Sequence, residues 1–316
     1  MPIPSLTRFG YFAGAFMVLL VVGVMVLAPD TATRFALQLE RRMAGLEMHT
    51  THIEGFEIPY LAGGEGPTLL LLHGFSANKD NFTRVAKHLT PHFRVVVPDL
   101  PGFGDASAPD DAGYGLPAQR RRIEAIIDAI GLSGPLHVGG SSMGGYLAMA
   151  LALENPDRVA SLWLLAPFGL EGAEQSELRT HYVETGEIGL LAETPAEFDA
   201  VMELVFHERP YLPWFVRDTL AKRAAARYER YRAIFLDVQE AEPLNARVAD
   251  IDVPTLLVWG EEDRALHPSG ARVYVEANPD ATDLQMMPAM GHLPMMEAPE
   301  AAAERLLAFH ARHFGD

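Results

Sequence analysis

The chain has 316 residues and a formal net charge of −17 at pH 7, with a sequence pI near 5.1. This acidic balance disfavours nucleic acid and other polyanionic partners, and it mainly supports solubility. The sequence contains no cysteine, which excludes disulfide bonds, thiolate metal sites and a cysteine nucleophile. A chain of this length can form two ordinary domains or one large α/β domain with an insertion, and we expect the second arrangement.

The N-terminal segment 1–29 is predicted to be a membrane anchor. No charged residue occurs from Phe9 to Pro29, and a helix of about 20 apolar residues is roughly 30 Å long, which matches a bilayer core. A cleaved signal peptide is the alternative. However, the apolar run exceeds the length of about 7 to 15 residues usual for such peptides, and Pro29 would follow the cut. We therefore expect residues 9–29 to cross a membrane once.

Residues 30–46 are predicted to form an amphipathic juxtamembrane helix or a linker. Apolar residues follow the span at spacings of three or four, namely Phe35, Leu39, Met43 and Leu46. The pattern fits a helix on the membrane surface, and a linker helix docked on the following domain explains it equally well. Arg8 precedes the span, whereas three arginines follow it within residues 30–46. This distribution favours a cytoplasmic main domain, but it does not decide the side of the membrane.

In the rest of the chain, short β-rich runs alternate with helical ones, which predicts an α/β fold with a mostly parallel sheet covered on both faces. The predicted strands are 48–53, 56–61, 68–72, 94–97, 135–138, 159–165, 254–259 and 283–287. The first two are expected to form an antiparallel pair, and the other six to be parallel. Helices are predicted at 81–89, 116–130, 145–154, 269–277 and 298–313. The core domain should therefore comprise residues 47–166 and 253–316.

One long insertion interrupts this alternation. The interval from Leu165 to Pro254 far exceeds the ordinary connection of about 2 to 6 residues. Its pattern is mostly helical, with candidate helices at 195–206, 213–228 and 231–238, so residues 167–252 are predicted to form a cap over the sheet. The cap could line a pocket with its aromatic residues or use them as its own core: Phe198, Phe206, Tyr211, Trp214, Phe215 and Phe235.

A candidate nucleophile lies between a predicted strand and a predicted helix. The residues there are Gly140, Ser141, Ser142, Met143 and Gly144. A serine on a strained strand-to-helix turn, with small residues two before and two after it, stands clear of the backbone and can attack a carbonyl carbon. A serine hydrolase is therefore the first hypothesis. Because the five-residue pattern is common by chance, an oxyanion donor, an acid and a histidine must accompany it.

The loop that follows strand 68–72 is the candidate oxyanion donor. It contains His73, Gly74 and Phe75, and Gly74 permits a close approach of the backbone to a substrate. An ordinary turn is the alternative interpretation of this loop. The nucleophile motif favours the functional interpretation, in which a backbone amide of this loop binds the oxyanion.

Candidates for the acid and the base lie further along the chain. Three carboxylates directly follow strand 254–259, namely Glu261, Glu262 and Asp263. One of the twelve histidines, His292, lies in the loop before the last predicted helix. His73 and His137 are its nearest rivals. His137 lies inside a predicted strand and His73 precedes the nucleophile, whereas this type of hydrolase uses the order serine, acid, histidine.

Five stretches carry a more specific resemblance: LLHGFSANKDN (71–81), VPDLPGFG (97–104), GGSSMGG (139–145), WGEEDR (259–264) and GHLPMMEAP (291–299). With them the chain resembles the α/β-hydrolase superfamily from about Leu46 to its C-terminus. Within that superfamily it is similar to the membrane-anchored monoacylglycerol lipases, a group of bacterial lipases and mammalian relatives with one N-terminal span. The resemblance implies an eight-stranded sheet with the cap inserted after the sixth strand.

The resemblance also implies roles for single residues. A glycine, two residues and an aspartate after the strand select Asp263, so that Ser142, Asp263 and His292 form the predicted triad. A second acid position occurs in some relatives just beyond the strand that ends at Leu165, and Ala166 occupies it here. The backbone amides of Phe75 and Met143 are the implied oxyanion donors. The implied substrate pocket has as candidates Gly74, Phe168, Phe198, Phe206, Trp214 and Leu293.

We therefore expect a membrane-anchored serine carboxylic-ester hydrolase that acts on monoacylglycerol or another single-chain lipid ester and requires no metal or organic cofactor. Its expected location is a bacterial inner membrane, bound through residues 9–29. Ser141 and Met143 also resemble the neighbours of the nucleophile in carbon–carbon bond hydrolases of ring-cleavage products, which is the first alternative. A catalytically silent, membrane-tethered binding protein is the second. Acyl length, head group and oligomeric state stay open.

Overall fold

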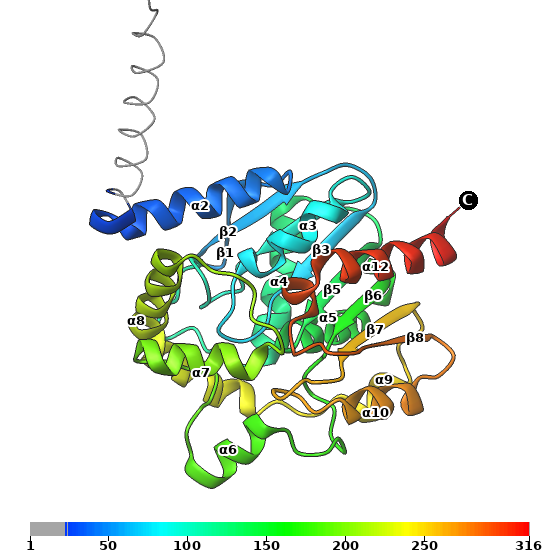
Figure 1. Ribbon diagram of the computed structural model, residues 1–316. Helices are drawn as coiled ribbons and strands as arrows, with labels where there is room; N and C mark the ends of the chain where they lie inside the picture. The colour runs from blue at the N-terminus through cyan, green and yellow to red at the C-terminus, as the bar shows by residue number, and fades with distance from the viewer. Residues whose placement is uncertain (1–22, 24, 316) are drawn as a thin grey trace, which may run out of the picture.

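The computed structural model of the chain (Figure 1) describes Gly23 and residues 25–315. Most of the predicted anchor at 9–29 therefore lies outside the described residues, which include only Gly23 and residues 25–29 of it. In the part of the chain that is described, no helix combines the length and the apolarity needed to cross a membrane.

Eight strands form one sheet in the order β1-β2-β4-β3-β5-β6-β7-β8. They are β1 (Glu47–Ile53), β2 (Phe56–Gly63), β3 (Thr68–Leu72), β4 (Arg94–Pro98), β5 (Leu136–Ser141), β6 (Val159–Leu165), β7 (Thr255–Gly260) and β8 (Thr282–Met287). Strand β2 is antiparallel to both of its neighbours, and β3 to β8 are parallel. The predicted mostly parallel sheet is confirmed.

Helices cover both faces of this sheet (Figure 1). Alternate side chains of a strand point to opposite faces: Leu70 and Leu72 pack in one core cluster, and Leu69 and Leu71 pack in the other. Helices α4 (Leu116–Ile130), α5 (Met143–Glu154) and α10 (Ser269–Ala277) close the first cluster. Helices α3 (Thr83–Leu89), α11 (Pro294–Glu297) and α12 (Pro299–Phe314) close the second. Burial on both faces explains why β3, β4 and β7 are mostly aliphatic.

The segment between β6 and β7 contains α6 (Glu177–Thr185), α7 (Pro195–Val205), α8 (Trp214–Gln239) and α9 (Asn245–Val248). The prediction of two helices at 213–228 and 231–238 is wrong, because α8 runs unbroken through both. The intervening Glu229 and Arg230 are good helix formers and cause no break. Helix α6 has no counterpart among the predicted helices. None of its residues is buried, so it has no apolar stripe from which to predict it.

Helix α2 (Pro29–Met43) begins one residue before the predicted segment 30–46, with Pro29 in its first turn, where proline costs no hydrogen bond. Several polar contacts dock it on the domain, among them an ion pair between Glu40 and Arg84 at 3.0 Å. The Thr33 hydroxyl is fully buried and donates to the Phe215 carbonyl of α8 at 3.3 Å. The Arg41 guanidinium donates twice to the Asp80 carboxylate, at 2.6 and 2.7 Å. Contacts of this kind are what a linker helix docked on the following domain would make.

Candidate active site

Ser142 lies on the turn between β5 and α5, in a conformation that few residues other than glycine adopt, with φ 55° and ψ −118°. The glycines on either side make the turn possible. A Cβ atom on Gly140 would lie 2.1 Å from the Gly144 carbonyl oxygen, and one on Gly144 would lie 2.0 Å from the Leu72 carbonyl oxygen. Backbone strain of this kind is costly and is found mainly at functional sites.

The backbone of Ser142 is also tied to the neighbouring strand. Its amide donates to the Leu165 carbonyl at 3.0 Å, and its carbonyl accepts from the Phe168 amide at 3.0 Å. The strained turn is therefore held from both sides at the carboxyl end of the parallel strands, where ligands of such sheets bind.

The predicted acid and base are in contact. His292 Nδ1 lies 2.7 Å from Asp263 Oδ2, and both side chains are buried, with 5% and 4% exposure. Asp263 Oδ1 accepts two backbone hydrogen bonds, from the amides of Ala265 and Leu266, each at 2.9 Å. Because an ionised carboxylate can only accept, the proton between the two side chains belongs to His292 Nδ1, which leaves Nε2 free to accept one.

The rival candidates lie elsewhere. Glu261 and Glu262 are exposed. His137 is buried, contacts the Ser161 hydroxyl at 2.8 Å and packs against the ring of His310 on α12. Burial, with a smaller effect of His310, lowers the pKa of His137 to about 4.

Two backbone amides near the nucleophile lack an acceptor. Within the described residues, neither the Phe75 amide nor the Met143 amide donates a hydrogen bond to the protein. Met143 is the first residue of α5, where amides have no partner within the helix. A Cβ atom on Gly74 would lie 3.2 Å from Ser142 Cβ, so the Gly74–Phe75 segment lies beside the nucleophile.

A cavity of about 590 Å³ connects these groups, and its lining includes Ser142 and His292. Its size is typical of pockets for small molecules. The lining also contains four of the predicted pocket residues: Gly74, Phe198, Phe206 and Leu293.

The other two predicted pocket residues are not among those that line the cavity. Phe168 packs at a tilt against Tyr146, with ring centroids 6.2 Å apart. Trp214 begins α8 with 54% of its surface exposed and stands edge-on to Phe215. The position of a residue in the sequence does not reveal the direction in which its side chain points.

Comparison with known proteins identifies the family of the chain. The model of a family described as the alpha/beta hydrolase fold matches residues 67–299. The chain belongs to the α/β-hydrolase family. The hydrolase is 35% identical over 286 residues to Lipase 1 of Psychrobacter immobilis, which covers 88% of this chain and 89% of that protein. Monoacylglycerol lipase ABHD6 of Mus musculus is 28% identical over 310 residues, covering 94% and 92% of the two chains.

Among solved structures, a membrane phospholipase A described as a bacterial virulence factor superposes with a TM-score of 0.89. It is 36% identical and covers 98% of this chain and 100% of its own. Together, the family and these relatives identify the chain as a serine ester hydrolase of the lipase and esterase type. This class agrees with the first of the three functions expected from the sequence.

Several lining residues of the hydrolase's cavity were not predicted from the sequence. Helix α2 contributes Leu37, Leu39 and Met43, and the cap contributes Met202 and Leu220 among others. The apolar spacing of α2 is the one signal that could have indicated them, since a docked helix must cover something with its apolar stripe.

Helix α7 holds the loops of the predicted acid and base. The Val205 carbonyl at its end accepts the His292 amide at 2.9 Å, and the Glu203 carbonyl accepts from the Arg264 guanidinium at 2.9 Å. The Glu297 carboxylate accepts from the Gly291 amide at 2.7 Å and from the Glu208 amide, which lies just beyond α7, at 3.0 Å. Burial raises the pKa of Glu297 despite these bonds. The cap and the loop of the predicted base, His292, therefore form one hydrogen-bonded unit.

A buried ion pair anchors the other end of the loop that begins with His73, Gly74 and Phe75, the predicted oxyanion loop. Lys79 and Asp99 are both fully buried, and Lys79 Nζ lies 2.7 Å from Asp99 Oδ2 and 2.9 Å from Asp105 Oδ2. Asp99 also accepts the amides of Lys79 and Asp105, each at 2.8 Å. Burial acts to lower the pKa of Lys79, but the attraction of these carboxylates and of Asp80 outweighs it and raises that pKa.

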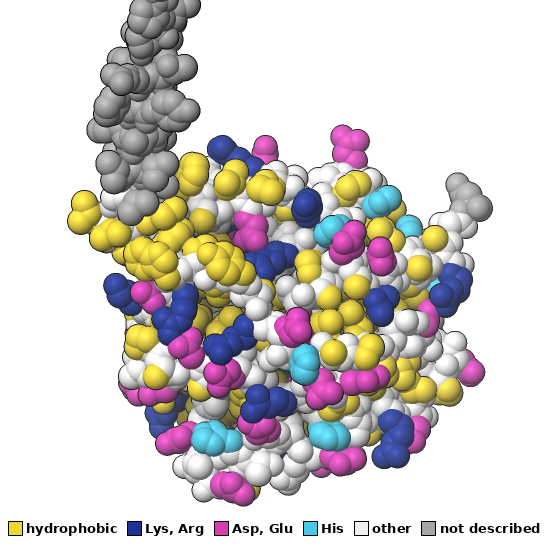
Figure 2. Space-filling model, viewed as in Figure 1, with side chains coloured by type: hydrophobic (Ala, Val, Ile, Leu, Met, Phe, Trp, Pro, Cys, Tyr) yellow, Lys and Arg dark blue, Asp and Glu magenta, His cyan; other side chains and the backbone are white. Residues whose placement is uncertain are grey.

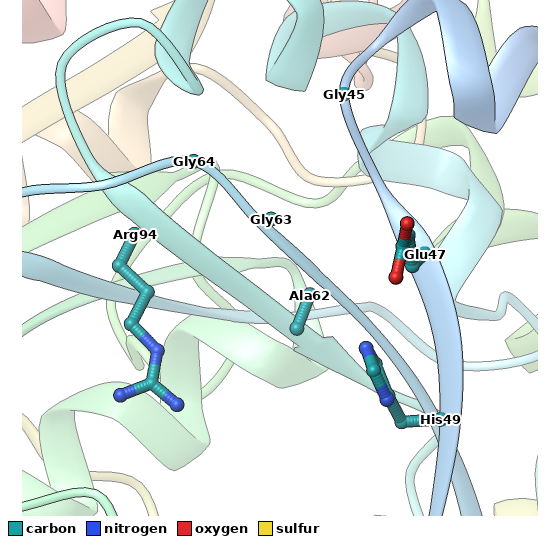
Figure 3. A pocket seen from close by; sticks show the side chains of 7 residues that line it. All are labelled: Gly45, Glu47, His49, Ala62, Gly63, Gly64 and Arg94. Carbon is teal, nitrogen blue, oxygen red and sulfur yellow. The ribbon is translucent and has the colours of Figure 1, made fainter.

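A second hollow lies at the other end of β1, β2 and β4 (Figure 3) and is open to solvent. Its polar side chains, Glu47, His49 and Arg94, do not converge on a common point. His49 stacks on Tyr60 instead, with ring centroids 5.2 Å apart. This hollow therefore lacks the convergent polar groups of a binding site.

Proposed function

We propose that the protein is a membrane-anchored lipase that hydrolyses esters of single-chain lipids, monoacylglycerols foremost, through a triad of Ser142, Asp263 and His292. The observation that carries the proposal is the mainly apolar cavity lined by both Ser142 and His292, with the His292–Asp263 hydrogen bond of 2.7 Å behind it. A nucleophile, a base and an apolar acyl site in one cavity are what lipid-ester hydrolysis requires.

In the proposed reaction, the Ser142 hydroxyl attacks the ester carbonyl while His292 Nε2 accepts its proton. Asp263 holds the imidazole in the required tautomer and stabilises the imidazolium that forms. The amides of Phe75 and Met143 donate to the developing oxyanion, and each such donor is worth about 10² to 10³ in rate.

Collapse of the tetrahedral intermediate breaks the bond to the alcohol, which takes the proton from His292 and leaves an acyl-enzyme on Ser142. Water then repeats the cycle: His292 accepts a proton from it, the hydroxide attacks the acyl carbon, and the proton returns to the departing Ser142 oxygen. The products are a fatty acid and an alcohol, and the balance requires no cofactor.

The surface around the cavity supports a lipid substrate. Three cavity-lining residues with large apolar side chains are also exposed, namely Leu39 (49%), Met43 (63%) and Tyr211 (83%). Phe35 on α2 and Trp214 on α8 extend the patch, with 67% and 54% exposure. Figure 2 shows hydrophobic side chains gathered over α2 and the adjoining part of the cap. Apolar patches of this kind mark surfaces that contact partners or membranes.

The sequence places the uncharged run Phe9–Pro29 directly before α2. If that run crosses a bilayer, α2 and the apolar patch lie at its surface, and single-chain lipids can enter the cavity from it. The relatives are named as lipases, monoacylglycerol lipases and a membrane phospholipase A, so phospholipids are the competing substrate class.

Substitution of the nucleophile tests the mechanism. Ser142→Ala should abolish hydrolysis of monoacylglycerol and labelling by a fluorophosphonate, while the neighbouring variant Ser141→Ala should keep the label. Full esterase activity in Ser142→Ala would refute the triad.

A substrate panel tests the lipid assignment with full-length protein in detergent. Monoacylglycerols of increasing chain length, lysophospholipids, diacyl phospholipids and short acetate esters are compared by kcat/KM. We expect the highest value for a medium- or long-chain monoacylglycerol. A clear preference for acetate esters would refute the lipid assignment, and a preference for diacyl phospholipids would transfer it to phospholipase activity.

Membrane contact through the apolar patch is tested by Phe35→Asp in the full chain. Hydrolysis of lipid in vesicles should fall, while hydrolysis of a soluble short-chain ester should not change. Val183→Asp is the matched control, because Val183 is 61% exposed on α6 and does not line the cavity. Equal effects of the two substitutions on vesicle activity would contradict the proposed contact.

A further inference from the structure

His73 has no part in the mechanism above, yet both of its ring nitrogens are engaged. It follows β3 directly, and its side chain is fully buried. Nδ1 lies 2.8 Å from the Gly74 carbonyl oxygen, and Nε2 accepts the Leu100 amide at 2.9 Å. The Phe103 ring packs edge-on against the imidazole, with centroids 5.8 Å apart.

These partners assign the tautomer. The Leu100 amide can only donate, so Nε2 must carry a lone pair, and the single ring proton lies on Nδ1, from which it donates to the Gly74 carbonyl. Burial lowers the pKa of His73, an effect that nearby Lys79 reinforces and Asp99 opposes. The ring is therefore neutral at neutral pH, with one fixed donor and one fixed acceptor.

The Gly74 carbonyl belongs to the same planar peptide unit as the Phe75 amide, and the two groups point in opposite directions across it. A donor that fixes the oxygen therefore fixes the direction of the N–H as well. Glycine itself provides little rotational restraint. The other donor to the Gly74 oxygen is the Ala77 amide, at the longer distance of 3.4 Å.

We propose that His73 is a positioning residue, whose Nδ1–H orients the Gly74–Phe75 peptide so that the Phe75 amide faces the substrate oxyanion beside Ser142. The inference rests on the oxyanion role proposed above for Phe75. His73 acts through the peptide and does not contact the substrate. Its contribution belongs to the transition state, because the amide is needed most when the carbonyl oxygen becomes charged.

Two substitutions separate the nitrogens of the ring. His73→Asn places an amide N–H at the position of Nδ1 and removes the acceptor for Leu100. His73→Gln places an amide oxygen near the position of Nε2 and removes the donor to Gly74. Each variant loses one buried hydrogen bond, so each should lose stability to a similar extent. Each therefore serves as the folding control for the other.

We expect His73→Asn to retain most of kcat. His73→Gln should lose kcat by about 10- to 1,000-fold with little change in KM, the upper end being the loss of a whole oxyanion donor. Affinity for a trifluoromethyl ketone, which Ser142 converts into a tetrahedral oxyanion, should fall in parallel. Binding of the product fatty acid should not change.

Equal loss of activity in the two variants, in proportion to their unfolding midpoints, would show a purely structural role and overturn the proposal. An imidazole protonated at Nε2 in the ¹⁵N spectrum of the full chain would overturn it as well. Fluorophosphonate labelling of Ser142 in the unsubstituted protein measures the reactivity of the nucleophile by itself. A failure of the His73 proposal can therefore be distinguished from a failure of the proposed function.

Discussion

Replacement of Lys79 by methionine should destabilise the protein through the carboxylate that it leaves behind. Asp99 is fully buried and accepts the Lys79 ammonium at 2.7 Å and two backbone amides at 2.8 Å each. Lys79→Met keeps the length of the side chain and both amides but removes the charge. Loss of one partner of a buried pair costs about 3–5 kcal/mol, and because the two amides remain, we expect about 3 kcal/mol.

Urea unfolding at pH 7 measures this cost as a lower midpoint with an unchanged slope. Arg247→Met is the control, because the Arg247–Glu154 pair is almost half exposed on both sides and should contribute less than about 1 kcal/mol. The double variant Lys79→Met with Asp99→Asn should recover part of the loss, since no buried charge is left unpaired. If Lys79→Met costs no more than the control, the ion pair does not anchor the predicted oxyanion loop.

Three further predictions concern stability and the acyl site. Since the folded pKa of His137 is about 4 and its ordinary value is 6.5, protonation favours the unfolded chain, and up to about 3 kcal/mol of stability should be lost as the pH falls through this window. The variant His137→Asn should lose less stability between pH 7 and pH 4.5 than the unsubstituted protein, as measured by urea unfolding. Gly144→Ala should prevent native folding, because its Cβ would lie 2.0 Å from the Leu72 carbonyl oxygen; thermal unfolding measures this. Met202→Trp should narrow the cavity and lower kcat/KM for long acyl chains more than for short ones.

Each of these predictions has a result that contradicts it. If the stability of His137→Asn depended on pH as much as that of the unsubstituted protein, groups other than His137 would cause the loss of stability at low pH. Gly113→Ala is the control for Gly144→Ala: Gly113 has a positive φ of 59°, but no atom lies within 4 Å of the added Cβ, so this substitution should cost only about 1 kcal/mol. For Met202→Trp, a uniform loss across chain lengths would place Met202 away from the acyl chain.

The sequence allowed the sheet and the candidate triad to be predicted because both depend on local patterns. Aliphatic runs mark strands buried on both faces, and Gly140 and Gly144 mark a turn that admits no Cβ atom. The choice of Asp263 and His292 as partners of Ser142 rests on the resemblance to the α/β-hydrolases, in which the acid and the histidine follow the nucleophile along the chain.

The cavity could not be predicted in the same way, because its walls come from segments distant in the sequence. Leu39 lines it only because α2 docks across α8, through contacts such as that of Thr33 with Phe215. Trp214 is aromatic and lies in the cap, as expected of a pocket residue, and it still faces solvent. The rotation of α8 about its axis decides which of its residues face the cavity.

The hydrogen bonds from the His292 amide to the Val205 carbonyl and from the Glu208 amide to the Glu297 carboxylate have a consequence for protein engineering. A cap that touched the core only through side chains could be exchanged with that of another hydrolase to alter specificity. Here the end of α7 supports the backbone of the histidine loop, so a chimera that replaces residues 195–208 would need a matching loop from the same donor. The cap segment, which lines the cavity, and the loop that carries the proposed base must therefore be exchanged together.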